Sequence, residues 1–160
     1  MARLKLAAVF SDECVLQREK NIAIFGTGAE GTLVKANLCG KTLETEKVQE
    51  SEGEARMTDG TDTVTLKEIA IGEVCLAGGQ SNMEFELQNC TEHEVLNNPA
   101  NEMIRFYYTQ KKAYMDADFF ASEEQTAWEC FGGKGTKYWS AVGYFFAAKL
   151  QKQLQVPVGI

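Results

Sequence analysis

The sequence has very little histidine, very little proline and no long apolar run. Among its 160 residues are one histidine, His93, and two prolines. A serine nucleophile that took its base from these residues would have to use His93. The apolar runs are strand-sized, and charge interrupts the amino-terminal segment before Ser11. The sequence therefore predicts neither a membrane span nor a secretory leader.

Basic residues are in deficit, and the cysteines form no CxxC pair. Sixteen lysines and arginines against 23 aspartates and glutamates give a net charge of -7, which disfavours nucleic acid and anionic membranes as partners. The densest basic segment, Lys111-Lys112, is typical of a solvated turn. An odd number of cysteines favours a reducing compartment, so we expect a cytoplasmic protein. The five are Cys14, Cys39, Cys75, Cys90 and Cys130.

The composition changes near residue 70. Before it, short β-rich runs at residues 21–25, 32–38 and 63–66 are separated by turn residues. The polar, acidic stretch 44–62 has few apolar anchors and predicts an exposed loop. We therefore expect a β-rich domain over residues 1–69.

After residue 70 the pattern alternates between strand and helix. Residues 103–108 predict a strand, and Ser140 predicts the N-cap of a helix that continues to Gln155. Pro157 ends this helix, and residues 156–160 predict the start of a buried strand. The sequence thus favours a layered α/β arrangement over residues 70–160. The apolar face expected for the helix consists of Val142, Phe145, Phe146, Leu150 and Leu154.

The most informative segment, residues 72–84, is an apolar run followed by Gly78-Gly79 and then Ser81. It predicts a strand that ends within two residues of Gly78, with Ser81 on the following connection near a helix start. Ser81 is the candidate nucleophile, and its backbone N–H, beside Gly79, is the first candidate donor to an oxyanion. The alternative is a tight turn in which Ser81 or Asn82 only caps a short helix.

Other candidate residues allow two interpretations each. His93, beside two glutamates, could titrate or help to hold a metal, but an exposed histidine on a charged turn is favoured. Glu84 and Glu86 could line a sugar pocket or serve as first-turn acids of a helix. The aromatic residues could stack on sugar rings or fill a core; they are Trp128, Trp139, Tyr107, Tyr108 and Tyr138.

Three blocks of sequence, at residues 6–18, 72–84 and 139–160, resemble the sialate O-acetylesterases of the SGNH-hydrolase superfamily. The resemblance implies a β-sandwich-like segment followed by a flavodoxin-like, three-layer α/β domain that removes acetyl groups from sugar hydroxyls. It implies Ser81 as nucleophile, an O-acetylated sugar or glycan as partner, and neither metal nor cofactor. Gln80, Asn82 and Glu84, which flank the serine, would then border the substrate pocket.

The chain departs from that family in two places. Where members carry a further β-hairpin before residue 63, this sequence has only the acidic stretch. The catalytic Asp-x-x-His pair of the family, which follows the strand at residues 156–160, has no counterpart among these residues. We therefore expect the amino-terminal portion of an esterase, with a truncated α/β domain whose uncovered sheet edge favours self-association. The alternative is a non-catalytic module that binds a glycan or a protein.

Overall fold

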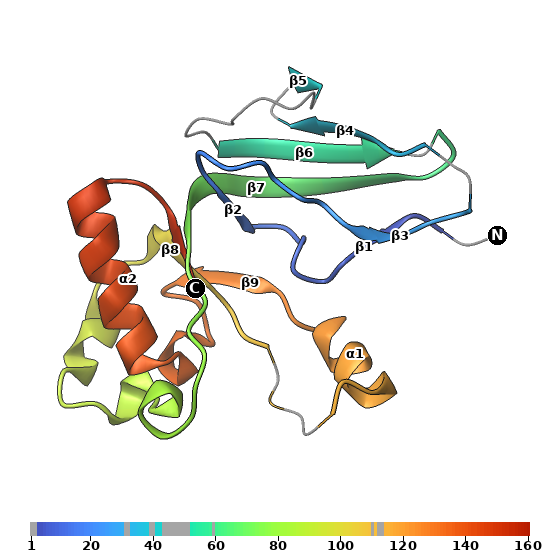
Figure 1. Ribbon diagram of the computed structural model, residues 1–160. Helices are drawn as coiled ribbons and strands as arrows, with labels where there is room; N and C mark the ends of the chain where they lie inside the picture. The colour runs from blue at the N-terminus through green and yellow to red at the C-terminus, as the bar shows by residue number, and fades with distance from the viewer. Residues whose placement is uncertain are drawn as a thin grey trace.

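The computed structural model describes residues 3–30, 33–38, 41–42, 52–58, 60–109, 111 and 114–160, with backbone alone for 41–42 and 52–54. These residues form a mixed α/β fold that is dominated by a large sheet (Figure 1). The elements that build the sheet and its flanks are β2 (Val15–Gln17), β4 (Lys35–Leu38), β5 (Lys41–Thr42), β6 (Glu52–Thr58), β7 (Thr63–Val74), β8 (Asn101–Tyr107), α1 (Ala117–Glu123), β9 (Trp128–Phe131), α2 (Ala141–Leu154) and β10 (Val158–Gly159).

The longest strand, β7, connects the two parts of the sheet. Its amino-terminal half pairs antiparallel with β6, and its last residues pair parallel with β10. The order β5-β4-β6-β7-β10-β8-β9 follows, with β2 beside β7. Strands β7, β10 and β8 run parallel, so their carboxyl ends lie at one edge. Because β7 crosses the expected boundary between residues 69 and 70, the two-domain division stays a prediction.

The expected loop at residues 44–62 is wrong for its second half, which forms β6. Ala55 and Met57 are each 1% exposed, whereas Arg56 between them is exposed. Two apolar anchors with period 2 are enough because β6 lies between β4 and β7 and gains ladder hydrogen bonds on both sides. Strand β6, paired antiparallel with β7, therefore stands where the sequence predicted only an acidic loop. Residues 43–51 lie outside the described residues.

Two smaller expectations at the amino terminus also need correction. Residues 21–25 form no strand. The strand lies directly after them as β3 (Gly26–Thr27), which pairs antiparallel with β1 (Lys5–Leu6). Gly26 allows this contact because a Cβ there would lie 2.1 Å from the Lys5 carbonyl oxygen. Ile22 and Ile24 pack against the core, and the Phe25 carbonyl accepts a hydrogen bond from the Ala7 N–H at 3.0 Å.

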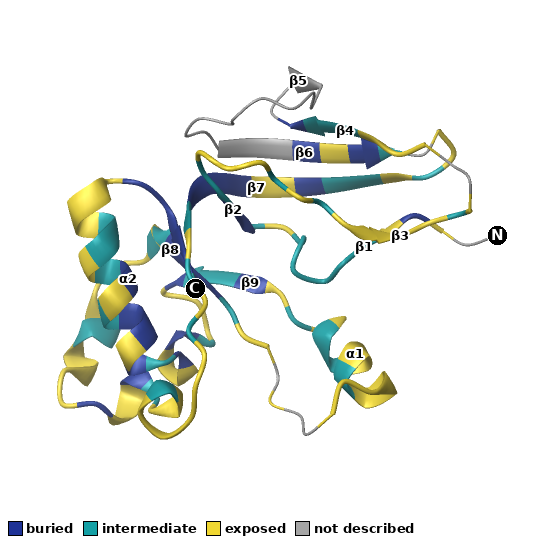
Figure 2. Ribbon diagram, in the orientation of Figure 1, coloured by how far each residue is buried: buried dark blue, intermediate teal, exposed yellow. Residues whose placement is uncertain are grey.

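Two hydrophobic cores lie on opposite faces of the sheet at β10. One lies mainly in the β-rich part, includes Val15, and is completed by Trp128 of β9; the other lies under α2 and includes Val158 (Figure 2). Gly159 faces the first core, where a Cβ would lie 2.8 Å from Val15 Cβ and 2.9 Å from the Trp128 ring. The buried strand expected at residues 156–160 is confirmed, and it separates the two cores.

Replacing Gly159 with alanine is expected to lower the free energy of unfolding by roughly 1–3 kcal/mol, because the added methyl overpacks the contact with Val15 and Trp128. Urea denaturation of the two proteins measures this difference. Gly78→Ala is the matched control, since a Cβ at Gly78 meets nothing within 4 Å. Equal stability of the Gly159→Ala variant and the native protein would contradict the packing described here.

Helix α2 confirms the predicted N-cap and part of the predicted face, since Phe145 and Leu150 pack partly buried against the core, whereas Val142, Phe146 and Leu154 are exposed. Ser140 Oγ accepts a hydrogen bond from the Gly143 N–H at 3.1 Å. The buried residues of the helix are Ala141, Gly143, Tyr144 and Ala147, whereas Val142 and Phe146 are 48% and 51% exposed. Small residues face the sheet because the stacked aromatic side chains of the core already fill the space there: Phe106, Phe131, Trp139 and Tyr144.

The predicted strand end is also wrong, because β7 ends at Val74 rather than beside Gly78. The last ladder bond of this strand runs from the Cys75 N–H to the Gly159 carbonyl at 2.9 Å. On the other side, the Gln17 side chain accepts from the Val74 N–H at 2.8 Å and so takes the place of a neighbouring strand. The residues after Cys75 are therefore free to leave the sheet.

The exposed edge expected after residue 160 does not lie at β10, which pairs with β7 on one side and β8 on the other. Self-association stays a prediction. The four described cysteines are free. None of the helices in the described part of the chain has the length and hydropathy to cross a membrane.

Candidate active site

A cleft lies at the carboxyl edge of the parallel strands, where ligands of open α/β sheets commonly bind. It has a volume of about 400 Å³. Its lining comes from the segment after β7, from the end of β8, and from the turn before α2, and includes Gly79, Glu84, Tyr108, Lys111, Tyr138 and Ser140. The sheet topology thus brings together segments that lie far apart in the sequence.

Ser81 begins the short helix η1 (Ser81–Glu84) directly after the glycine pair, as predicted. Its φ of 55° lies in the left-handed region, which costs a non-glycine residue roughly 1–3 kcal/mol. Four other described non-glycine residues have positive φ, and none of them lies in the turn from Gly79 to Glu84: Glu13, Glu19, Glu68 and Gln155. This strained turn holds an exposed serine beside the cleft.

The other predicted site residues are distributed around that turn. Gly79, with a φ of 150°, lines the cleft, and a Cβ there would lie 3.3 Å from Met83 Cβ. Gln80 is the N-cap of η1, and both Gln80 and Asn82 are exposed; their carbonyls accept from the N–H groups of Met83 and Phe85. Their side chains do not belong to the cleft lining, so a role in binding stays a prediction.

Glu84 lines the cleft and forms an ion pair with Lys111, which the sequence assigned to a solvated turn. The hydrogen bond from Lys111 lowers the pKa of Glu84, with a further contribution from the Ser81 backbone. The N–H predicted to bind an oxyanion therefore faces a carboxylate here. Because 27 positions separate the two partners, no local pattern could predict the pair.

His93 does not line the cleft. It is exposed at the start of η3 (His93–Asn97), and its Nδ1 lies 2.9 Å from the Cys90 carbonyl oxygen. No hydrogen bond between Ser81 and His93 occurs in the described part of the chain. The described residues also contain no group of three or more His, Cys, Asp or Glu suited to a metal. The favoured interpretation, an exposed histidine on a charged turn, fits this position.

Cys75 is the nearest thiol in sequence to the cleft segment, and it is a poor alternative nucleophile. Burial raises its pKa, and the Glu73 carboxylate raises it further. A thiol with a raised pKa carries little thiolate at neutral pH. Cys75 also does not belong to the cleft lining, which begins at Leu76.

The aromatic residues divide between the core and the cleft. Trp128 and Trp139 are buried, and Trp139 stacks on Phe106 with ring centroids 4.2 Å apart. Tyr108 and Tyr138 are instead 56% and 54% exposed and line the cleft. The core interpretation is thus right for the tryptophans, and these two tyrosines remain available to a ligand.

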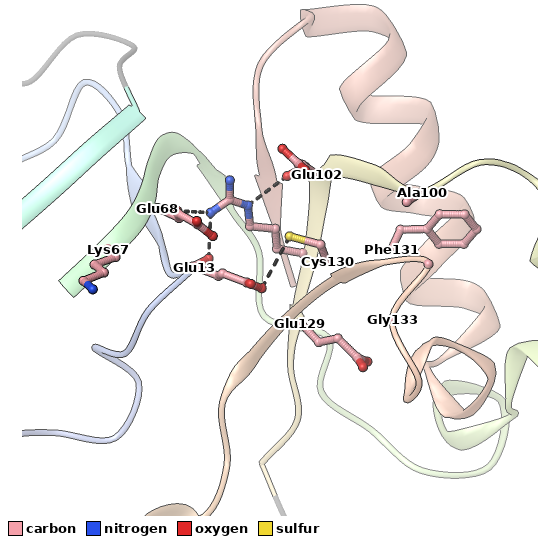
Figure 3. Close-up of a pocket in the computed structure, with 11 residues that line it drawn as sticks. Glu13, Lys67, Glu68, Ala100, Glu102, Glu129, Cys130, Phe131 and Gly133 are labelled. Carbon is pink, nitrogen blue, oxygen red and sulfur yellow. Dashed lines mark hydrogen bonds between the residues drawn. The ribbon is translucent and has the colours of Figure 1, made fainter.

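A second, larger cavity of about 850 Å³ lies between the β-rich part and β8 and β9 (Figure 3). Arg105, 4% exposed, donates to the carbonyls of Glu13, Glu68 and Glu102. Glu13 and Glu68 have φ values of 63° and 54°. Two of the three carbonyls that accept hydrogen bonds from Arg105 therefore belong to residues with strained, left-handed backbone. Nearby, burial raises the pKa of Cys130 to about 11. This arrangement joins the two parts of the fold.

No protein-family model matches the chain, and no curated protein matches it. Among solved structures, it is similar to a carbohydrate acetylesterase from Xanthomonas citri, with a TM-score of 0.83 over 98% of this chain. The chain shares that fold. It spans 39% of the length of that protein, and the sequences are 21% identical. At this identity, the likeness shows the fold alone.

Proposed function

We propose that this chain forms the amino-terminal portion of a carbohydrate O-acetylesterase, with Ser81 as nucleophile. The observation that carries the proposal is the strained left-handed turn that holds an exposed Ser81 beside a cleft at the carboxyl edge of the sheet. Strain of this kind clusters at functional sites because the rest of the fold must maintain it. The fold shared with a carbohydrate acetylesterase supports the same activity.

In this proposal the α/β part is the beginning of a flavodoxin-like SGNH domain, and the β-rich part is its amino-terminal companion. Ser81 Oγ attacks the acetyl carbonyl, and the proton passes to a base. The backbone N–H of Ser81 stabilises the oxyanion once the Glu84 carboxylate has moved away from it. His93 does not belong to the cleft lining, and the resemblance to the esterase family suggests that the base comes from an Asp-x-x-His pair outside these 160 residues.

The 160-residue chain alone is expected to hydrolyse an aryl acetate no faster than its Ser81→Ala variant, because the hydroxyl stays protonated without a base. A chain that continues into the Asp-x-x-His pair is expected to gain serine-dependent hydrolysis. Acetate release from both forms measures the difference. Turnover by the short chain that is lost in both Ser81→Ala and His93→Ala would make His93 the base and contradict the division proposed here.

The alternative is a non-catalytic module that binds a glycan or a protein. The exposed tyrosines of the cleft are compatible with it, because they need no nucleophile to bind a sugar. The reading frame after Ile160 discriminates between the two. An Asp-x-x-His pair downstream favours the esterase, whereas a stop codon there favours the binding module.

A further inference from the structure

The cleft beside Ser81 continues into an adjoining cavity of about 390 Å³, which lies within the range typical of small-ligand sites. Four residues line both spaces and therefore form their common wall: Glu86, Phe106, Tyr108 and Tyr138. Glu129, Trp139 and the backbone around Gly135 complete the second cavity. The two spaces are therefore neighbours at the end of β8, and we call the two together the groove.

We propose that this adjoining cavity is a second sugar subsite, which holds the ring next to the acetylated one and stacks it on Tyr138 and Tyr108. This inference rests on the proposed function for the position of the acetylated ring. It extends that function to a substrate class: a neutral oligosaccharide of at least two rings, rather than a single acetylated sugar.

The two tyrosines supply the apolar surface. Both side chains are more than half exposed, although aromatic rings of this size gain free energy when they are covered. The C–H face of a pyranose covers an aromatic ring and leaves the phenol hydroxyl free to form hydrogen bonds. The Lys137 ammonium lies over the Tyr138 ring, 4.8 Å from the ring centroid, so one face of this ring already has a cation–π contact.

Two carboxylates supply the polar contacts. Glu86 Oε2 accepts from Gln88 Nε2 at 2.7 Å and from Asn89 Nδ2 at 3.2 Å. Glu129 accepts from the Gly135 N–H at 2.8 Å and from Trp139 Nε1 at 3.2 Å. These bonds hold both carboxylates in position, and each carboxylate has about four acceptor sites, so capacity remains for sugar hydroxyls.

The charge of the groove selects against acidic sugars. Glu84, Glu86 and Glu129 line its two parts, and Lys111 is engaged by Glu84. A sugar carboxylate would lie near fixed negative charges in a partly desolvated space, which is unfavourable. Neutral hydroxyl-rich rings incur no such repulsion. The geometry thus favours a neutral oligosaccharide over a sialylated one.

Calorimetric titration of the Ser81→Ala variant tests the subsite without hydrolysis. The probes are unacetylated tetrasaccharides of cellulose, xylan and mannan, their monosaccharides, and sialyllactose. At least one neutral tetrasaccharide is expected to bind on the order of 10-fold more tightly than its monosaccharide, with sialyllactose weaker. Tyr138→Ala and Tyr108→Ala should each remove that gain, and Tyr138→Phe should keep it.

Tyr114→Ala is the matched control, since Tyr114 is 77% exposed and lines neither cavity. No gain over monosaccharides, a gain that survives in both tyrosine-to-alanine variants, or tighter binding of sialyllactose would overturn the subsite. Because binding is measured without the nucleophile, these outcomes are distinct from failure of the esterase. That failure would appear as acetate release that does not depend on Ser81.

Discussion

In a form of the protein that carries the proposed Asp-x-x-His pair, acetate release is expected to fall by at least about 1000-fold when Ser81 is replaced by alanine. The hydroxyl oxygen forms the bond to the acetyl carbon, and the nearest thiol in sequence, Cys75, does not line the cleft. The cleft lining does not include the Ser81 side chain, so KM should change little while kcat falls. Steady-state kinetics on an acetylated oligosaccharide separates the two constants.

Ser122→Ala is the matched control for this experiment. Ser122 Oγ donates to the Phe119 carbonyl at 2.7 Å inside α1, and neither cavity of the groove includes it. Its loss should leave kcat within a factor of two or so, as for most substitutions far from a site. A Ser81→Ala variant that kept a tenth or more of the native kcat would rule out Ser81 as the nucleophile.

Replacing Arg105 with methionine is expected to lower the free energy of unfolding by about 3–5 kcal/mol. Methionine fills much of the same space but donates no hydrogen bond, so the carbonyls of Glu13, Glu68 and Glu102 lose their donor. Glu13 and Glu68 would also keep their left-handed backbone without the hydrogen bonds that their carbonyls accept from Arg105. Urea denaturation measures the loss.

Arg3→Met provides the comparison, because Arg3 is exposed and the same change there should cost less than about 0.5 kcal/mol. For Arg105→Lys, the loss in free energy of unfolding should lie between the losses for Arg3→Met and Arg105→Met, since a lysine ammonium cannot reproduce the planar fork of a guanidinium. If Arg105→Met unfolded within 1 kcal/mol of the native protein, the three carbonyl contacts would not be what joins the β-rich part to β8.

The local features of the site could be predicted from the sequence. A glycine pair after an apolar run predicts a turn, and Ser81 begins a short helix there. Ser140 is the N-cap of α2 because a serine oxygen accepts from an N–H three residues later. Each of these features depends on a few neighbouring residues, and so the local sequence is enough to predict the turn at Ser81 and the N-cap at Ser140.

The acidic stretch that forms β6 shows where local patterns are insufficient. Among the residues of β6 whose side chains the structure describes, Ala55 and Met57 are the buried ones, and this apolar content does not indicate a strand. Its stability comes from backbone pairing with β4 and β7, which lie on either side. The buried face of α2 has a similar cause, since the aromatic core under the helix leaves room for Ala147 but not for Phe146.

The sequence by itself determined that a serine would stand on a turn after a strand, that a capped helix would follow, and that the last residues would enter a buried strand. The tertiary structure alone decided what surrounds that serine: the ion pair of Glu84 with Lys111, the exposed Tyr108 and Tyr138, and the position of His93 outside the cleft. Parallel pairing of β7, β10 and β8 brings these distant residues to one edge. Such neighbours follow from long-range pairing and packing, which no local spacing of residues encodes.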